Sequence, residues 1–241
     1  EKIELIGLLC KYFIRRNVTD TPPTRDLTNY FIDVIAEANK MESYSFDQIK
    51  QIILDKGKPV SDQLFEEKLK GDLYEENVGA TRYILSSIES HLSHTKEVDT
   101  DFYKREKKKF IWTIEHIFPQ TPTDEYWKNE FEWISEERYV NYNWSIGNLL
   151  LLSSSINSSL QNDSYPNKMQ PKYSSSWELK RKWYADGSHS EIEVTQKYDN
   201  WWPKEIEKRG EDLLSFLEKR WGVQLSEESK KKLLFLSESE S

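Results

Sequence analysis

Two short polar clusters in apolar surroundings carry residue types that are suited to hydrolytic chemistry. Glu115 and His116 stand at the end of an apolar, β-favouring run, and Pro119 ends that run because proline cannot donate to a β-ladder. Asn148 and Asn157 follow in a second apolar stretch, about thirty residues later. We expect the two clusters to meet in the fold and to form one site.

Hydrolysis of a phosphodiester would use both clusters. The reaction needs a general base that takes a proton from water and a cation that stabilises charge on the leaving oxygen. His116 suits the first task, since an unperturbed pKa of about 6.5 leaves the imidazole partly neutral at working pH. Glu115 and Asn157 suit the second, because Mg²⁺ prefers hard oxygen ligands. Asn148 is placed to fix the loop or to orient the imidazole.

The composition indicates a folded protein with an acidic balance. The 241 residues carry a formal net charge of −8, yet aromatic residues reach 13%, which is unlike a disordered chain. The apolar runs are too short to span a bilayer. Cys10 is the single cysteine, so an internal disulfide and a cysteine-based zinc site are excluded, and a reducing cytoplasm is favoured.

Basic and acidic residues balance in the middle of the chain. Residues 101–190 hold 12 basic and 12 acidic side chains, so the acidic excess lies in the flanks. Two basic runs in this part are candidates for phosphate contacts, although a solvated helix face is the plainer interpretation of either run alone. The candidate DNA-contacting side chains are Lys107, Lys108, Lys168, Lys172, Lys180, Arg181 and Lys182.

Helical periodicity and capping residues predict a predominantly helical α+β fold. The chain is expected to divide into an N-terminal helical region (1–100), a core (101–190) and C-terminal helices that pack on the core (191–241). A strand is expected over 110–114, and 186–200 is expected to be irregular or strand-like. Helices are expected over about 1–17, 25–41, 46–56, 62–69, 80–94, 124–131, 156–160, 176–184, 203–221 and 227–236.

The ordered motifs resemble a known nuclease domain. They are the stretches 113–120 (TIEHIFPQ), 146–151 (IGNLLL), 156–158 (INS) and 167–168 (NK). In this order they are similar to the HNH nuclease domain with a His-x-x-Pro motif. That domain forms the C-terminal half of GmrSD-type, modification-dependent restriction endonucleases. The resemblance extends to the upstream helices and to the closing segment around Arg209, and it covers most of the chain.

The resemblance implies a small ββα-metal core and a role for each motif residue. His116 would be the general base, Asn148 the structural asparagine, and Asn157 the last catalytic position. Glu115 and Asn157 would hold Mg²⁺ or Mn²⁺, and Lys168 would contact phosphate.

The resemblance also implies an activity and partners. The chain would be a metal-dependent DNA endonuclease or nicking domain of a prokaryotic, cytoplasmic restriction system that defends against phage. Its partners would be DNA, including modified phage DNA, and an N-terminal nucleotide-hydrolysing sensing domain that is absent from the chain.

Two alternatives stay open at this stage. The chain could be a catalytically inactive, HNH-like helical module that binds DNA or protein, in which case DNA binding would survive His116→Ala. It could also be a zinc hydrolase that uses His91, His94 and His116, although their spacing matches no common zinc motif.

Overall fold

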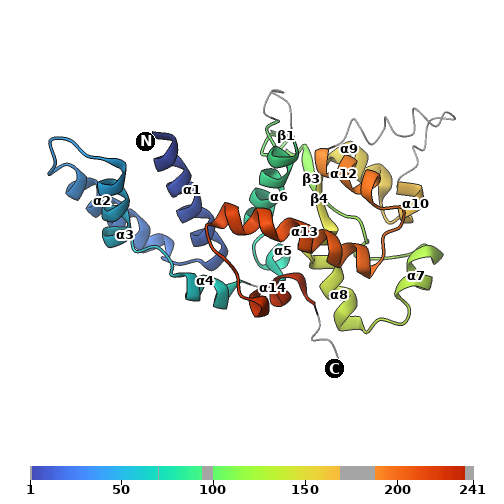
Figure 1. Ribbon diagram of the computed structural model, residues 1–241. Helices are drawn as coiled ribbons and strands as arrows, with labels where there is room; N and C mark the ends of the chain where they lie inside the picture. Colours follow the sequence, from blue (N-terminus) through green and yellow to red (C-terminus); the bar gives the residue numbers. More distant parts are fainter. Residues whose placement is uncertain (1, 70, 94–99, 169–187, 237–241) are drawn as a thin grey trace. The chain divides into compact units, whose positions relative to one another are not determined.

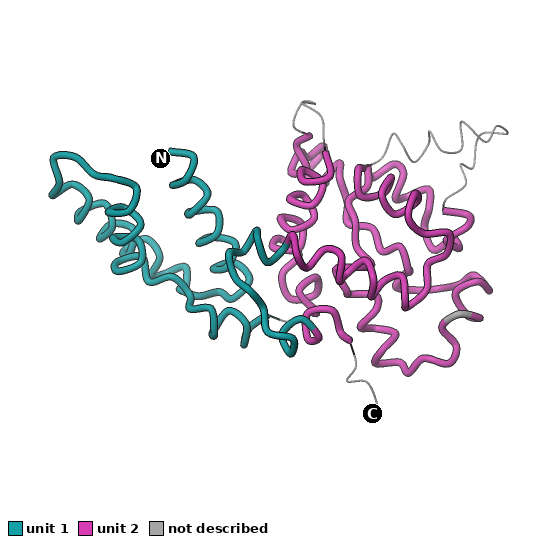
Figure 2. Tube along the Cα trace, in the orientation of Figure 1, with its two compact units in different colours: residues 1–70, 217–230 teal, residues 71–216, 231–241 magenta. Residues whose placement is uncertain are grey.

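The computed structural model describes residues 2–69, 71–93, 100–168 and 188–236, and it confirms a mostly helical α+β fold with short antiparallel strands (Figure 1). The chain divides into two compact units (Figure 2). The first contains residues 1–70 and 217–230, and the second contains 71–216 and 231–241. These limits do not coincide with the region boundaries predicted at residues 100 and 190. Both polar clusters belong to the second unit.

The first unit is helical, and its helices begin where the sequence supplies caps. Ser45 accepts a hydrogen bond from the backbone of Gln48, and the Gln48 side chain accepts one from the backbone of Ser45, which completes a capping box. Ser61 is a simple N-cap for the next helix, because its side chain accepts a hydrogen bond from the backbone of Leu64. The helices that lie wholly in this unit are α1 (Lys2–Thr19), α2 (Thr24–Ala38), α3 (Phe46–Lys56) and α4 (Asp62–Lys68).

The second unit surrounds its strands with helices. None of the helices in the described part of the chain is long and apolar enough to cross a membrane. Helices α13 (Pro203–Trp221) and α14 (Glu227–Leu234) each include residues of both units. The other helices of the second unit are α5 (Leu73–Glu76), α6 (Val78–Leu92), α7 (Glu125–Phe131), α8 (Glu136–Trp144), the 3₁₀ turn η1 (Ile146–Asn148), α9 (Ser154–Leu160), α10 (Tyr165–Lys168) and α12 (His189–Lys197).

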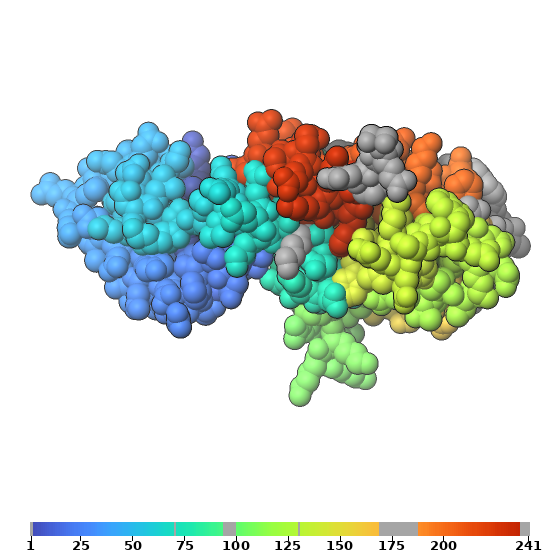
Figure 3. Space-filling model, turned by 90° about the horizontal axis from the view of Figure 1, so that it is seen from below, coloured from blue at the N-terminus to red at the C-terminus, as the bar shows by residue number. Residues whose placement is uncertain are grey.

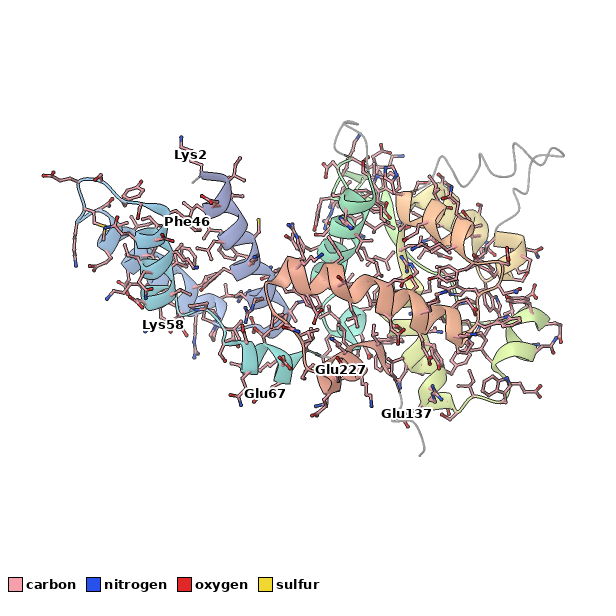
Figure 4. All side chains as sticks on the ribbon, in the orientation of Figure 1. Lys2, Phe46, Lys58, Glu67, Glu137 and Glu227 are labelled. Carbon is pink, nitrogen blue, oxygen red and sulfur yellow. The ribbon has the colours of Figure 1, made fainter. Side chains whose placement is uncertain are left out.

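A two-stranded antiparallel sheet lies at the centre of this unit. Strand β3 (Trp112–His116) pairs with β4 (Leu149–Ser153) so that Glu115 lies opposite Leu150 and His116 opposite Leu149. Helix α9 follows β4 directly, which gives the order strand, strand, helix. Helices α6, α9 and α12 contact β4, and buried side chains fill the space between the strands and helices (Figures 1 and 4).

A second, smaller sheet precedes the central one. Strands β1 (Arg105–Glu106) and β2 (Lys109–Phe110) form a hairpin, with Lys107 and Lys108 as its turn. In the space-filling view the hairpin projects from the rest of the second unit (Figure 3). Arg82 of α6 holds its base, because the guanidinium lies 3.8 Å from the centre of the Phe110 ring and donates to the carbonyl of Trp112 at 2.7 Å.

Two sequence-based expectations fail in the second unit. The segment 186–200, expected to be irregular or strand-like, instead contains the helix α12, because Ser188 and Glu191 form a capping box at its start. Helix α8 was not predicted, although Ser135 caps it by accepting from the backbone of Arg138. The helix predicted over 176–184 lies outside the described residues.

Gly147 lies where the backbone of η1 comes close to helix α13. A Cβ atom at this position would lie 2.1 Å from the carbonyl oxygen of Ile206 in α13 and 3.0 Å from the backbone nitrogen of Gly210. Backbone atoms cannot move aside as a side-chain end can, so glycine is required for η1 to pack on α13 at this distance.

Candidate active site

The two polar clusters meet along the β3–β4 pair, with Asn148 beside the end of β3 and Asn157 beside its middle. The carbonyl of Asn148 accepts a hydrogen bond from the backbone of Ile117 at 3.1 Å. From the other cluster, the side-chain amide of Asn157 donates to Thr113 Oγ1 at 3.0 Å and to the Ile114 carbonyl at 3.2 Å. The expectation that the clusters meet is therefore confirmed.

Asn148 fixes the turn that follows His116. Its side chain is fully buried, and Oδ1 accepts from the backbone of Phe118 at 2.8 Å and from Trp201 Nε1 at 3.0 Å. Its Nδ2 donates to the carbonyls of Phe118 at 2.9 Å and Asn143 at 3.2 Å. Every hydrogen-bonding position of the amide is used, which fits the first of the two roles expected for this residue.

Arg209 supports the other side of the same turn, a role that no sequence pattern predicts. Its guanidinium is 2% exposed and donates from Nη1 to the carbonyls of Gly147 at 2.7 Å and Leu149 at 2.9 Å. A charge-assisted bond of this kind holds the carbonyls that flank Asn148. Arg209 comes from α13, about sixty residues after this turn.

His116 is buried, neutral and without a partner on one ring nitrogen. The side chain is 8% exposed, and the ring of Tyr74 packs edge-on against it with centroids 4.7 Å apart. Burial, together with the positive charge of Lys168, lowers the pKa of His116 to about 4. Its Nε2 has no hydrogen-bond partner. The neutral imidazole is thus in the protonation state that a general base needs.

Glu115 points to the opposite face of the strand, since successive side chains alternate. It is 6% exposed, and its Oε1 lies 2.6 Å from Lys168 Nζ. Burial raises the pKa of Glu115, and the Lys168 ammonium opposes that rise. Lys168 is itself 2% exposed and also donates to the carbonyls of His116 and Ile117, at 3.0 Å each.

The donors around Glu115, as arranged here, do not fit a divalent metal ion. A carboxylate oxygen and two carbonyls already surround an ammonium. In the described part of the chain, no group of three or more His, Cys, Asp or Glu side chains is arranged to hold an ion. The binding of Mg²⁺ or Mn²⁺ by Glu115 and Asn157 therefore stays a prediction.

The predicted DNA-contacting residues fall into three groups. Lys107 and Lys108 are exposed at the tip of the β1–β2 hairpin. Lys168 is buried with all three of its N–H donors used, so its ammonium is not at the surface in this structure. The remaining four, Lys172, Lys180, Arg181 and Lys182, lie outside the described residues.

The histidines of the zinc hypothesis are not brought into one described cluster. The ring of His91 stacks on Phe216 with centroids 4.5 Å apart, and His94 lies outside the described residues. His116 contacts Tyr74. Among the residues that the structure describes, no metal-ligating group includes any of them.

A small cavity on the Glu115 side contains a carboxylate that sequence reasoning missed. The cavity measures about 20 Å³ and is lined by Glu115, Lys168, Glu191 and apolar side chains of β4, α9 and α12. Glu191 is 1% exposed; its Oε2 accepts from the backbone of Ser188, while its Oε1 has no partner. The Ser-x-x-Glu spacing at 188–191 was the available signal, but it predicts a helix cap and not a place beside Glu115.

Comparison with known proteins agrees with these motifs. The family model described as GmrSD restriction endonucleases, C-terminal domain, matches residues 58–216, which is more than half of the chain and includes both polar clusters. No curated protein and no solved structure gives a match. The chain belongs to the family of GmrSD restriction endonuclease C-terminal domains.

Proposed function

We propose that this chain is a DNA endonuclease or nicking domain of the HNH type, in which His116 acts as the general base. The observation that carries the proposal is the neutral imidazole at the end of β3, whose buried Nε2 has no partner. Family membership supports DNA as the substrate, and the order strand, strand, helix around His116 and Asn157 supports the HNH type.

The proposed reaction is hydrolysis of one phosphodiester. The imidazole takes a proton from water, the resulting hydroxide attacks phosphorus, and the bond to the leaving oxygen breaks. Asn148 keeps the backbone after His116 in place through its two bonds to Phe118. A need for Mg²⁺ or Mn²⁺ is part of the proposal and rests on the resemblance alone.

We place a DNA contact at the β1–β2 hairpin. Lys107 and Lys108 have φ angles of 47° and 70°, in a two-residue turn where glycine and asparagine are usually preferred. Two lysines in this strained conformation put two exposed cations at the tip. The hairpin leads through Ile111 directly into β3, so its tip is at most roughly 26 Å from His116 along an extended chain. That reach suits phosphates on the same duplex segment.

The hairpin proposal predicts a change in salt dependence. In Lys107→Ala/Lys108→Ala, DNA binding should weaken, and the slope of log K against log salt concentration should fall by about 2, because each lost phosphate contact removes about 0.9. Fluorescence anisotropy with a labelled duplex at several salt concentrations measures this. The control is Lys50→Ala/Lys56→Ala, which removes two exposed lysines of α3. An unchanged slope in the hairpin variant contradicts the contact.

Plasmid nicking tests the proposed activity itself. Supercoiled plasmid is incubated with the parent, His116→Ala and Asn157→Ala, in Mg²⁺, in Mn²⁺ and in EDTA. We expect His116→Ala to nick about a hundred-fold more slowly than the parent, since loss of a general base costs 10²–10⁴-fold. His91→Ala is the control, because His91 stacks on Phe216 and has no part in the proposed reaction.

The outcomes separate the parts of this proposal. Equal nicking by the parent, His116→Ala and Asn157→Ala would rule out His116 as the base. Full activity in EDTA would leave the base in place and remove the metal from the mechanism. A thermal melt of each variant shows that any lost activity is not lost folding.

A further inference from the structure

We infer that Lys168 is the resident cation of the Glu115 site, and that its ammonium positions the backbone that carries His116. The Nζ atom lies 2.6 Å from Glu115 Oε1 and 3.0 Å from each of the carbonyl oxygens of His116 and Ile117. These three oxygens match the three donors of an ammonium. The cation that the resemblance leads one to expect beside Glu115 is therefore part of the chain.

The lysine reaches this place from a firmly packed scaffold. It is the last residue of α10, and its backbone donates to the Ser164 carbonyl at 2.8 Å. At the start of the same helix, Tyr165 is 2% exposed, donates from its hydroxyl to the Tyr198 carbonyl at 2.9 Å, and stacks on Trp201. A buried ammonium held in this way is built into the core and is not a surface lysine in a chance contact.

The charges around the ammonium explain why a cation is needed there. Glu115 is 6% exposed, and Glu191 lines the same cavity with an unpartnered Oε1. Burying a carboxylate without a compensating charge is costly, so removal of the lysine leaves a site that favours any small cation able to enter. The cavity of about 20 Å³, together with the space that the ammonium group leaves, gives such an ion room beside two carboxylates.

Lys168 is thus a positioning residue with respect to the proposed nuclease reaction. It acts on His116 through the backbone carbonyl and not on the substrate, and this part of the inference rests on the proposed function. Its identity as the resident cation does not depend on nuclease activity. The test accordingly measures thermal unfolding, so that failure of this inference and failure of the proposed function are distinguishable.

The experiment compares melting temperatures of the full chain in EDTA and in an excess of Mn²⁺. The proteins are the parent, Lys168→Met, Glu115→Gln and Glu115→Gln/Lys168→Met. The control is Lys197→Met, which breaks a partly exposed ion pair in which Lys197 Nζ lies 2.7 Å from Glu193 Oε1. In EDTA we expect Lys168→Met to melt roughly 10 °C lower than the parent, because a buried carboxylate loses its partner. The control should stay within about 2 °C.

The change in melting temperature with Mn²⁺ shows whether the Lys168 ammonium occupies the place of a metal ion beside Glu115. We expect Mn²⁺ to restore several degrees to Lys168→Met and to leave the parent and the double variant unchanged. A purely structural lysine would give no rescue that depends on Glu115. The inference is overturned if Mn²⁺ stabilises the parent and Glu115→Gln removes that effect, or if Lys168→Met melts with the parent. Should Lys168→Met fail to fold, the Mn²⁺ titrations of the parent and of Glu115→Gln still decide.

Discussion

Asn148→Ala is expected to lower the free energy of unfolding by about 4 kcal/mol. The substitution removes the partners of the Phe118 N–H, the Phe118 carbonyl, the Asn143 carbonyl and the Trp201 indole N–H. Each buried polar group left without a partner costs about 1–3 kcal/mol, and some of the four will recover part of that cost by relaxing. Urea denaturation followed by tryptophan fluorescence measures the change, with the slope m checked against the parent.

Asn157→Ala is the matched control for this prediction. Its amide is half-buried and loses only the contacts to Thr113 Oγ1 and the Ile114 carbonyl, so we expect about 1 kcal/mol. The two asparagines are the same residue type at two places in one site. If both variants lost the same small amount, the turn after His116 would not depend on Asn148.

The second large effect is a loss of stability on acidification that comes from His116. Its pKa is about 4 in the folded protein and about 6.5 in the unfolded chain. Between these values His116 binds a proton in the unfolded state but not in the folded state, so the free energy of unfolding falls as the pH is lowered from 6.5 to 4. The full effect is about 3 kcal/mol.

Buried carboxylates act in the opposite direction and require a difference measurement. Burial raises the pKa of Glu89, Glu115 and Glu191, so the stability that they contribute falls as the pH rises. His116→Gln removes only the imidazole titration. We expect the stability of the parent relative to this variant to fall by about 3 kcal/mol between neutral pH and pH 4.

Urea denaturation of both proteins across this pH range gives the difference directly. An NMR titration of the His116 ring in the folded parent gives its midpoint independently, which is expected near 4. Parallel stability curves, together with a ring midpoint close to the ordinary histidine value, would show that burial does not suppress protonation of His116.

Local signals in the sequence were enough to predict the frame of the site. Pro119 marked the end of β3, and the serine caps marked the starts of α3 and α4. The spacing of Asn148 and Asn157 after the Glu-His pair predicted that the two clusters meet. The inferences from Pro119 and from the serine caps rest on backbone chemistry within a few residues of each signal.

The parts that sequence reasoning missed depend on distant partners. Lys168 appeared to belong to a basic surface run, and its burial follows from a contact with Glu115, 53 positions earlier. Tyr74 reaches His116 from a four-residue helix that has no strong periodicity. Glu191 signals only a helix cap in the sequence, because its place beside Glu115 is set by the packing of α12 on β4.

The backbone from His116 to Phe118 is held in place by hydrogen bonds, and this limits how DNA can reach the proposed base. The Ile117 and Phe118 amides and all three carbonyls are each bonded to Asn148 or Lys168. Amide hydrogens here should exchange at close to the rate of global unfolding, because no small local opening frees them. The histidine therefore cannot swing toward a phosphate on a loop. In the proposed reaction the scissile bond is therefore brought to a fixed imidazole, and Tyr74, which packs edge-on against it, must move aside.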